Sequence, residues 1–168
     1  MKKVFIDGSA GTTGLRIFDR LRDREDIELF TLPEEKRKDE KTIKEAINNS
    51  DITFLCLPDT AAFEAVEMNE NPNTVIIDTS TAHRTLNGWS YGFPELSRHF
   101  KEKIINSKRI AVPGCHASGF ISIVYPLVES GILKSDALLS CFSLTGYSGG
   151  GKKMIAQYEG EDKAELLF

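Results

Sequence analysis

The chain of 168 residues is 40% hydrophobic and 27% charged, a globular composition long enough for one full domain, or for one domain and part of another. Its net charge of −4 comes from intermixed acidic and basic residues, which argues against a nucleic acid or another polyanion as the main partner. No apolar stretch reaches the roughly 18–20 residues of a membrane span, the start turns polar too soon for a signal peptide, and three scattered cysteines suggest neither disulfides nor a metal site, so a reducing cytoplasm fits best.

Short apolar runs alternate with helical patterns over the first half of the chain. The expected strands are residues 4–6, 27–32, 51–57 and 73–78. The expected helices are residues 15–22, 42–49 and a third that Asp59 caps and that ends near Met68. Strands that are apolar on both faces and alternate with helices imply an α/β fold with a mostly parallel sheet that helices cover on both sides.

The second half is less regular. Residues 80–108 are polar, residues 109–112 form a further strand, and the apolar run 117–128 predicts a helix. Residues 138–145 read as the first strand of a new sheet, yet only about 20 residues follow it, too few for several partner strands. Either this strand joins the first sheet, or the chain is a fragment of a longer protein.

A glycine-rich segment follows the first strand and opens the first helix, which is the context of a dinucleotide-binding turn. Glycines permit the tight turn and a close approach to a pyrophosphate, and the helix N-terminus supplies N–H donors. The expected contacts are Gly8, Ser9, Ala10, Gly11, Thr12, Thr13 and Gly14. Ala10 stands where the usual motif has its second glycine, and the alternative is an ordinary strand–turn–helix.

The second strand ends without the carboxylate that usually binds the ribose hydroxyls of NAD. Lys36, Arg37 and Lys38 follow and could contact a 2′-phosphate, which favours NADP, although a solvated charged loop containing Glu34 and Glu35 is the alternative. Ligands of open parallel sheets bind beyond the carboxyl ends of the strands. Residues 57–60 and 78–84 follow the third and fourth strands, so Pro58 and Ser80 should border the same crevice.

Cys115 follows a Pro-Gly turn and precedes the apolar run. If that run is a helix, unpaired N–H groups and the helix dipole at its N-terminus favour a thiolate, the form that attacks a carbonyl carbon. The alternative is a buried packing residue. His116 is a poor candidate for its base, because neighbours on a helix point in different directions. His83 is expected to be structural, and Cys56 and Cys141 to be inert core residues of strands.

Two features suit an anionic substrate. Arg84 could hold a carboxylate or a phosphate through a bidentate contact, with a structural ion pair as the equal alternative. The loop 146–152 contains four glycines, two hydroxyl side chains and a lysine, and could present backbone donors to an anion, with a flexible linker as the alternative. Its candidate contacts are Ser148, Gly149 and Lys152.

Five motifs in this order resemble those of N-acetyl-γ-glutamyl-phosphate reductases of the shorter type. They are residues 8–15 (GSAGTTGL), 78–84 (DTSTAHR), 91–95 (YGFPE), 112–117 (VPGCHA) and 146–152 (GYSGGGK). The resemblance implies a Rossmann domain joined to an α/β domain like that of glyceraldehyde-3-phosphate dehydrogenase. It implies that Cys115 attacks the acyl phosphate to form a thioester, which NADPH reduces to N-acetylglutamate semialdehyde, a step of arginine biosynthesis.

Family members are roughly twice as long and carry a catalytic histidine downstream of the Gly-rich loop, a position that His83, His99 and His116 do not match. The resemblance therefore implies an NADP-binding domain over residues 1–114 and the incomplete start of a catalytic domain over 115–168, with homo-oligomers expected of the full-length form. Two alternatives stay open: a catalytically silent NADP-binding fragment, and a related dehydrogenase acting on aspartyl phosphate.

Overall fold

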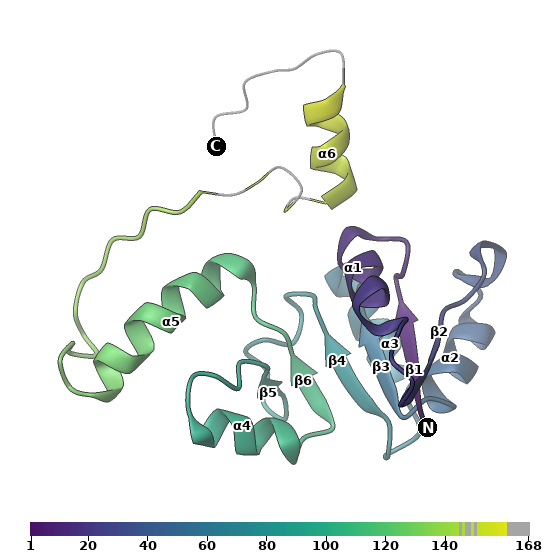
Figure 1. Ribbon diagram of the computed structural model, residues 1–168, viewed down its shortest axis with the longest axis horizontal. Helices are drawn as coiled ribbons and strands as arrows, with labels where there is room; N and C mark the ends of the chain where they lie inside the picture. The colour runs from purple at the N-terminus through teal and green to yellow at the C-terminus, as the bar shows by residue number, and fades with distance from the viewer. Residues whose placement is uncertain (145, 147–148, 150, 161–168) are drawn as a thin grey trace.

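A computed structural model shows an α/β fold built on one six-stranded sheet, and it describes residues 1–144, 146, 149 and 151–160 (Figure 1). The strand order is β2-β1-β3-β4-β6-β5, and every neighbouring pair is parallel. This confirms the predicted parallel sheet. The strands are β1 (Lys2–Asp7), β2 (Ile27–Phe30), β3 (Ile52–Leu55), β4 (Val75–Asp78), β5 (Ser90–Tyr91) and β6 (Arg109–Ala111).

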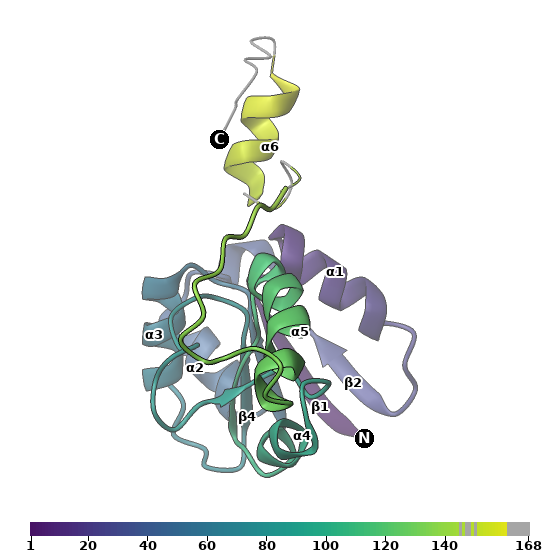
Figure 2. The same cartoon turned by 90° about the vertical axis from the view of Figure 1, so that its left-hand side faces the viewer.

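Within the described residues, helices connect the strands of the sheet and two further helices follow the last strand, the final one standing away from the sheet (Figure 2). They are α1 (Thr12–Leu21), α2 (Glu40–Asn48), α3 (Asp59–Glu67), α4 (Arg98–Ile105), α5 (Cys115–Glu129) and α6 (Gly151–Glu159), with a 3₁₀ turn, η1, at Glu34–Lys36. From β1 the chain moves outward to β2, whereas from β3 it moves the other way to β4. Because such crossovers are right-handed, α1 lies on one face and α2 and α3 on the other.

The core lies between the sheet and the face formed by α2 and α3. Phe5 of β1, Leu55 of β3 and Ile76 of β4 pack there against Ile47 of α2 and Ala65 of α3, all nearly or fully buried. The rings of Phe5 and Phe30 stack beside this cluster with centroids 5.2 Å apart. The central strands are thus held rigidly, which fixes the loops that leave their carboxyl ends.

The strand expected at residues 138–145 is wrong for the residues that the structure describes. Residues 138–144 form an irregular, exposed segment that joins no strand of the sheet, and Leu138 and Phe142 lie in solvent. Figures 1 and 2 show the segment leading away from the sheet to α6. The apolar pattern is there, but a strand needs a partner for its N–H and C=O groups. No residue of α5 is buried, although the helix forms as predicted.

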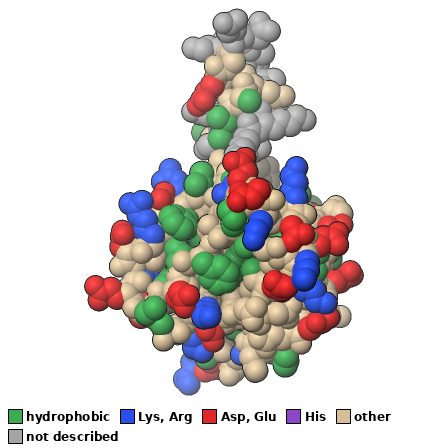
Figure 3. Space-filling view, turned by 90° about the vertical axis from the view of Figure 1, so that its right-hand side faces the viewer, with side chains coloured by type: hydrophobic (Ala, Val, Ile, Leu, Met, Phe, Trp, Pro, Cys, Tyr) green, Lys and Arg blue, Asp and Glu red, His purple; other side chains and the backbone are tan. Residues whose placement is uncertain are grey.

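Acidic and basic side chains are interspersed over the face of the molecule seen in Figure 3. Elsewhere in the described chain, ion pairs join such side chains, including Lys2 with Asp51 and Lys44 with Glu70. Because each pair joins opposite charges, the electrostatic potential around it is not dominated by one sign. Among the described residues no helix is long and apolar enough to cross a membrane.

Candidate active site

The nucleotide crevice that the sequence predicts would lie at the carboxyl ends of β1 and β3, the neighbouring strands from which the chain leaves in opposite directions. Gly8 has φ +76°, and a Cβ there would stand 2.2 Å from the carbonyl oxygen of Cys56. A Cβ on Gly14 would stand 2.4 Å from the Gly8 carbonyl oxygen, to which Gly11 N donates (2.9 Å). The turn therefore packs directly on the end of β3, and residues 8 and 14 must be glycine.

The helices differ in how they start. Helices α2 and α4 have side-chain caps, since Asp39 accepts from Thr42 N and Ser97 from Phe100 N. Helices α1, α3 and α5 have Gly11, Pro58 and Gly114 as their N-cap residues, none of which caps the helix with a side chain. Their first N–H groups and dipoles are thus available to an anion at the crevice, which suits a dinucleotide pyrophosphate at α1.

The other residues predicted to contact the nucleotide occupy the same edge of the sheet. Lys36 is exposed in η1 beyond the end of β2, whereas Arg37 is half-buried and its Nε donates to the Leu32 carbonyl (3.0 Å). Pro58 is exposed at the start of α3. Ser80 is buried, and its hydroxyl donates to Asp78 (2.7 Å). The side chain of Ser80 therefore shapes the loop after β4.

That loop is built around a buried carboxylate. Asp78 accepts hydrogen bonds from Ser80 N (3.0 Å), from Ser80 Oγ and from Nδ1 of His83 (2.7 Å), and both Asp78 and His83 are nearly or fully buried. The His83 ring stacks on Trp89 at 4.0 Å and meets the edge of Phe63 at 4.7 Å. The structural role predicted for His83 is confirmed.

Two further contacts tie this loop to its neighbours. Asp59, predicted as a cap, is instead the first residue of α3, and its carboxylate accepts from the backbone N–H (2.9 Å) and the hydroxyl of Thr81. These hydrogen bonds lower the pKa of Asp59. Arg84 donates from Nε to the Val112 carbonyl (2.9 Å) and from Nη2 to the Thr79 carbonyl (3.1 Å). Among the described residues Arg84 forms no ion pair, the alternative considered for it; its hydrogen-bond partners there are backbone carbonyls.

Cys115 is the first residue of α5 and its side chain is exposed, as its predicted place at a helix N-terminus requires. Gly114 precedes it, and the Gly114 carbonyl accepts from the backbone N–H (2.8 Å) and the hydroxyl (2.9 Å) of Ser118, which closes the first turn. Cys56 is half-buried at the end of β3, and burial raises its pKa to about 11, which makes it unreactive. The buried position predicted for Cys141 is wrong, because the segment that carries it joins no sheet and leaves it exposed.

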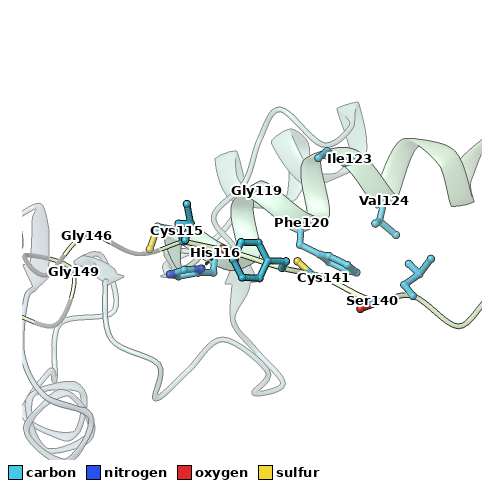
Figure 4. A pocket seen from close by; sticks show the side chains of 14 residues that line it. Cys115, His116, Gly119, Phe120, Ile123, Val124, Ser140, Cys141, Gly146 and Gly149 are labelled. Carbon is cyan, nitrogen blue, oxygen red and sulfur yellow. Dashed lines mark hydrogen bonds between the residues drawn. The ribbon is translucent and has the colours of Figure 1, made fainter. Parts of the chain in front are cut away.

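A cavity of about 700 Å³ lies between α5 and the segment after it (Figure 4). Cys115, His116 and Phe120 line it from the helix, and Cys141 and Gly149 from the other side. Nδ1 of His116 hydrogen-bonds to Ser143 Oγ, which ties the segment to the start of α5. The structure thus brings Gly149 to the cavity of Cys115. Ser148 lies outside the described residues, as does the side chain of Lys152.

Three features of the site were not found by sequence reasoning. Burial raises the pKa of Asp7, next to the glycine turn, to about 6. Thr81 joins the loops after β3 and β4, and Trp89 covers His83. Only the Asp7-Gly8 adjacency is visible in the sequence, since the others depend on contacts between distant segments. Within the part of the chain that the structure describes, no three His, Cys, Asp or Glu side chains cluster to hold a metal.

A family model described as "Semialdehyde dehydrogenase, NAD binding domain" matches residues 3–104, which include the crevice. The chain belongs to the semialdehyde dehydrogenase family. Its relatives include the Pseudomonas putida protein named N-acetyl-gamma-glutamyl-phosphate reductase 2, 49% identical over 98% of the chain and 53% of that protein. A Trichormus variabilis protein named N-acetyl-gamma-glutamyl-phosphate reductase is 48% identical over 94% of the chain and 49% of that protein. The predicted resemblance is confirmed, and the chain spans about half the length of these relatives.

Solved structures of aspartate semialdehyde dehydrogenases share the fold. The enzyme from Francisella tularensis superposes with a TM-score of 0.64 at 19% identity, covering 94% of the chain and 48% of that enzyme. The Candida albicans enzyme, whose structure is described with NADP, has a TM-score of 0.54 at 17% identity, covering 77% of the chain and 47% of that enzyme. These likenesses confirm the Rossmann-like fold class of the semialdehyde dehydrogenase family.

Proposed function

We propose that the chain is the nucleotide-binding and nucleophile-bearing part of an NADPH-dependent N-acetyl-γ-glutamyl-phosphate reductase of arginine biosynthesis. One observation carries this proposal: an exposed cysteine begins a helix at the same sheet edge as the tightly packed glycine turn after β1. The names of relatives that are 46–49% identical support the choice of substrate.

The crevice residues suit NADP. The glycine turn and the uncapped start of α1 would bind the pyrophosphate, and Lys36 and Arg37 stand beyond β2, where a 2′-phosphate would reach. Bound NADPH would supply a hydride. The proposed contacts are Gly8, Ser9, Ala10, Gly11, Thr12, Thr13, Gly14, Lys36, Arg37, Pro58 and Ser80.

Cys115 is the proposed nucleophile. Its thiolate attacks the acyl carbon of the substrate, the bond from that carbon to the phosphate oxygen breaks, and phosphate leaves with the electron pair. The resulting thioester accepts a hydride at its carbonyl carbon. The carbon–sulfur bond then breaks, which returns the thiolate and releases the semialdehyde.

Other predictions extend this proposal. Gly149, which lines the cavity of Cys115, would face the substrate together with Ser148 and Lys152, and an anion-binding role for Arg84 stays a prediction. The division into a nucleotide-binding unit (1–114) and the start of a catalytic domain (115–168) is likewise proposed, as is a homo-oligomer of the full-length form.

Acyl transfer in the absence of nucleotide tests the proposal. Incubation with N-acetyl-γ-glutamyl phosphate should acylate Cys115 stoichiometrically and release one phosphate per chain, as measured by peptide mass mapping and a phosphate assay. Cys115→Ser should abolish both, and the control Cys141→Ser should leave both unchanged. A chain that binds NADP but forms no acyl-cysteine would be the catalytically silent alternative, and faster acylation by aspartyl phosphate would identify the related dehydrogenase.

A further inference from the structure

Arg84 joins the two loops that meet at the candidate site. Thr79 directly follows β4, and its N–H (3.0 Å) and hydroxyl (3.0 Å) donate to the Leu55 carbonyl at the end of β3. Val112 directly follows β6, and its N–H donates to the Asp78 carbonyl (2.8 Å). The guanidinium donates to the carbonyls of both Thr79 and Val112, so one planar group ties the cofactor side of the edge to the turn before Cys115.

The side chain of Arg84 projects from a rigid base. The residue before it, His83, is held by the buried Asp78 and lies between Trp89 and Phe63. Asp59 fixes the same loop through Thr81. Because these contacts leave the loop little freedom, its position determines where the guanidinium lies.

Gly114 fits against this guanidinium. Its φ of −75° and ψ of 154° are open to any residue, so backbone conformation does not require glycine. A Cβ at this position would instead stand 2.9 Å from Arg84 Nη1 and 3.6 Å from Cζ. The guanidinium occupies the space of the missing side chain, one residue before the cysteine.

We infer that Arg84 is a positioning residue: it clamps the Val112–Gly114 turn and thereby holds Cys115 at the N-terminus of α5. Its consequence for catalysis rests on the proposed role of Cys115, whereas the clamp itself does not. This assignment differs from an anion-binding Arg84, which would act only on a substrate that carries a carboxylate or a phosphate.

Competitive alkylation of the whole chain by iodoacetamide, a neutral reagent without phosphate, tests the clamp. In Arg84→Ala the ratio of Cys115 to Cys141 labelling near neutral pH should fall about three- to tenfold, because the lost hydrogen bonds no longer hold the exposed cysteine in place at the start of α5. Methylguanidine should restore the ratio by refilling the slot. Arg84→Lys should stay low, since an ammonium cannot span both carbonyls, and Arg98→Ala, at an exposed arginine of α4, should match the wild type.

Two further measurements separate positioning from loss of fold. Cys56 is half-buried, so its labelling should stay slow in every folded variant. Gly114→Ala should lower the labelling ratio when Arg84 is present and have little further effect in Arg84→Ala, where the added methyl group has room. An unchanged ratio in Arg84→Ala, a full rescue by lysine, or an equal effect of Gly114→Ala in both backgrounds would overturn the clamp.

The result is independent of the proposed function. If iodoacetamide labelling does not respond to Arg84 but acyl phosphate still acylates Cys115, the clamp fails and the function stands. If labelling responds but no acyl phosphate reacts, the clamp stands and the proposed substrate fails.

Discussion

Asp7 directly precedes the glycine turn, and its carboxyl group has a strongly raised pKa. It ends β1, is 7% exposed, and burial raises its pKa from 3.8 to about 6 even though the N–H of Gly8 donates to it and acts in the opposite direction. A buried carboxylate is costly when ionised. The ionised side chain of Asp7 therefore lowers the stability of the fold at neutral pH.

Asp7→Asn should raise stability at alkaline pH and not at acidic pH. Between the unfolded pKa of 3.8 and the folded value near 6, the native state binds more protons than the unfolded state, so stability falls as pH rises through that window. The amide removes this loss, which amounts to at most about 3 kcal/mol above pH 6. Urea unfolding at pH 4 and pH 8 measures it, with the exposed Asp136→Asn as control. A gain that is equal at both pH values would contradict the burial of a titrating carboxylate.

At the scale of elements, the strand–turn–helix that begins the chain depends on one glycine for two reasons. Gly8 has a positive φ, and it also packs against the backbone of β3. Gly131, after α5, has a similar φ of +73°, yet a Cβ there would meet nothing within 4 Å. Comparing substitutions at these two glycines therefore separates the cost of the strained backbone from the cost of the steric clash.

Gly8→Ala should therefore destabilise the fold much more than Gly131→Ala. The left-handed backbone conformation costs each alanine roughly 1–2 kcal/mol. At residue 8 the clash with the Cys56 carbonyl adds at least about 2 kcal/mol by forcing β1 and β3 apart. Chemical denaturation of both variants gives the difference. Equal losses would show that the turn can move away from β3.

The elements that were predicted well are those whose pattern is local. Apolar runs between helical stretches predicted strands β1 to β4, and the Pro-Gly turn predicted the start of α5 at Cys115. Strand β5 is only two residues long and is held by β6, so it has no pattern of its own. Residues 138–144 have the apolar pattern of a strand, but in the described chain they have no neighbouring strand to pair with, so the predicted strand does not form. The sequence did not predict the helix caps of Asp39 and Ser97 or the contacts of Arg84. These depend on the final geometry of the loops.

At the scale of the whole molecule, the described chain divides into a packed sheet and an open remainder. The sheet carries the buried core, whereas Ile123 of α5 and Leu138, Phe142 and Leu144 of the segment after it are 67–101% exposed. The curated relatives extend over about twice this length. Nucleotide binding is expected to belong to the packed part alone.

Brief chymotrypsin treatment should cut within residues 138–144 before it cuts β1, where Phe5 is 1% exposed. The sheet-containing product should bind NADP as tightly as the intact chain, and both should prefer NADP to NAD by roughly tenfold to a hundredfold if Lys36 contacts the 2′-phosphate. Mass mapping identifies the cut, and calorimetric titration compares the nucleotides. Loss of binding after the cut, or equal affinity for NAD, would contradict this division of the chain or this choice of cofactor.

The uncapped starts of α1, α3 and α5 have a consequence for how such a site changes over evolutionary time. An anion-binding surface made of main-chain N–H groups cannot be removed by exchanging side chains, except where proline takes away the donor or a larger residue replaces a glycine. In the proposed nucleotide site, most positions could then vary freely without loss of phosphate binding. Anion binding by the backbone thus tolerates most substitutions. A change of cofactor or substrate would instead require changes in the few side chains, such as Lys36, that extend beyond the backbone.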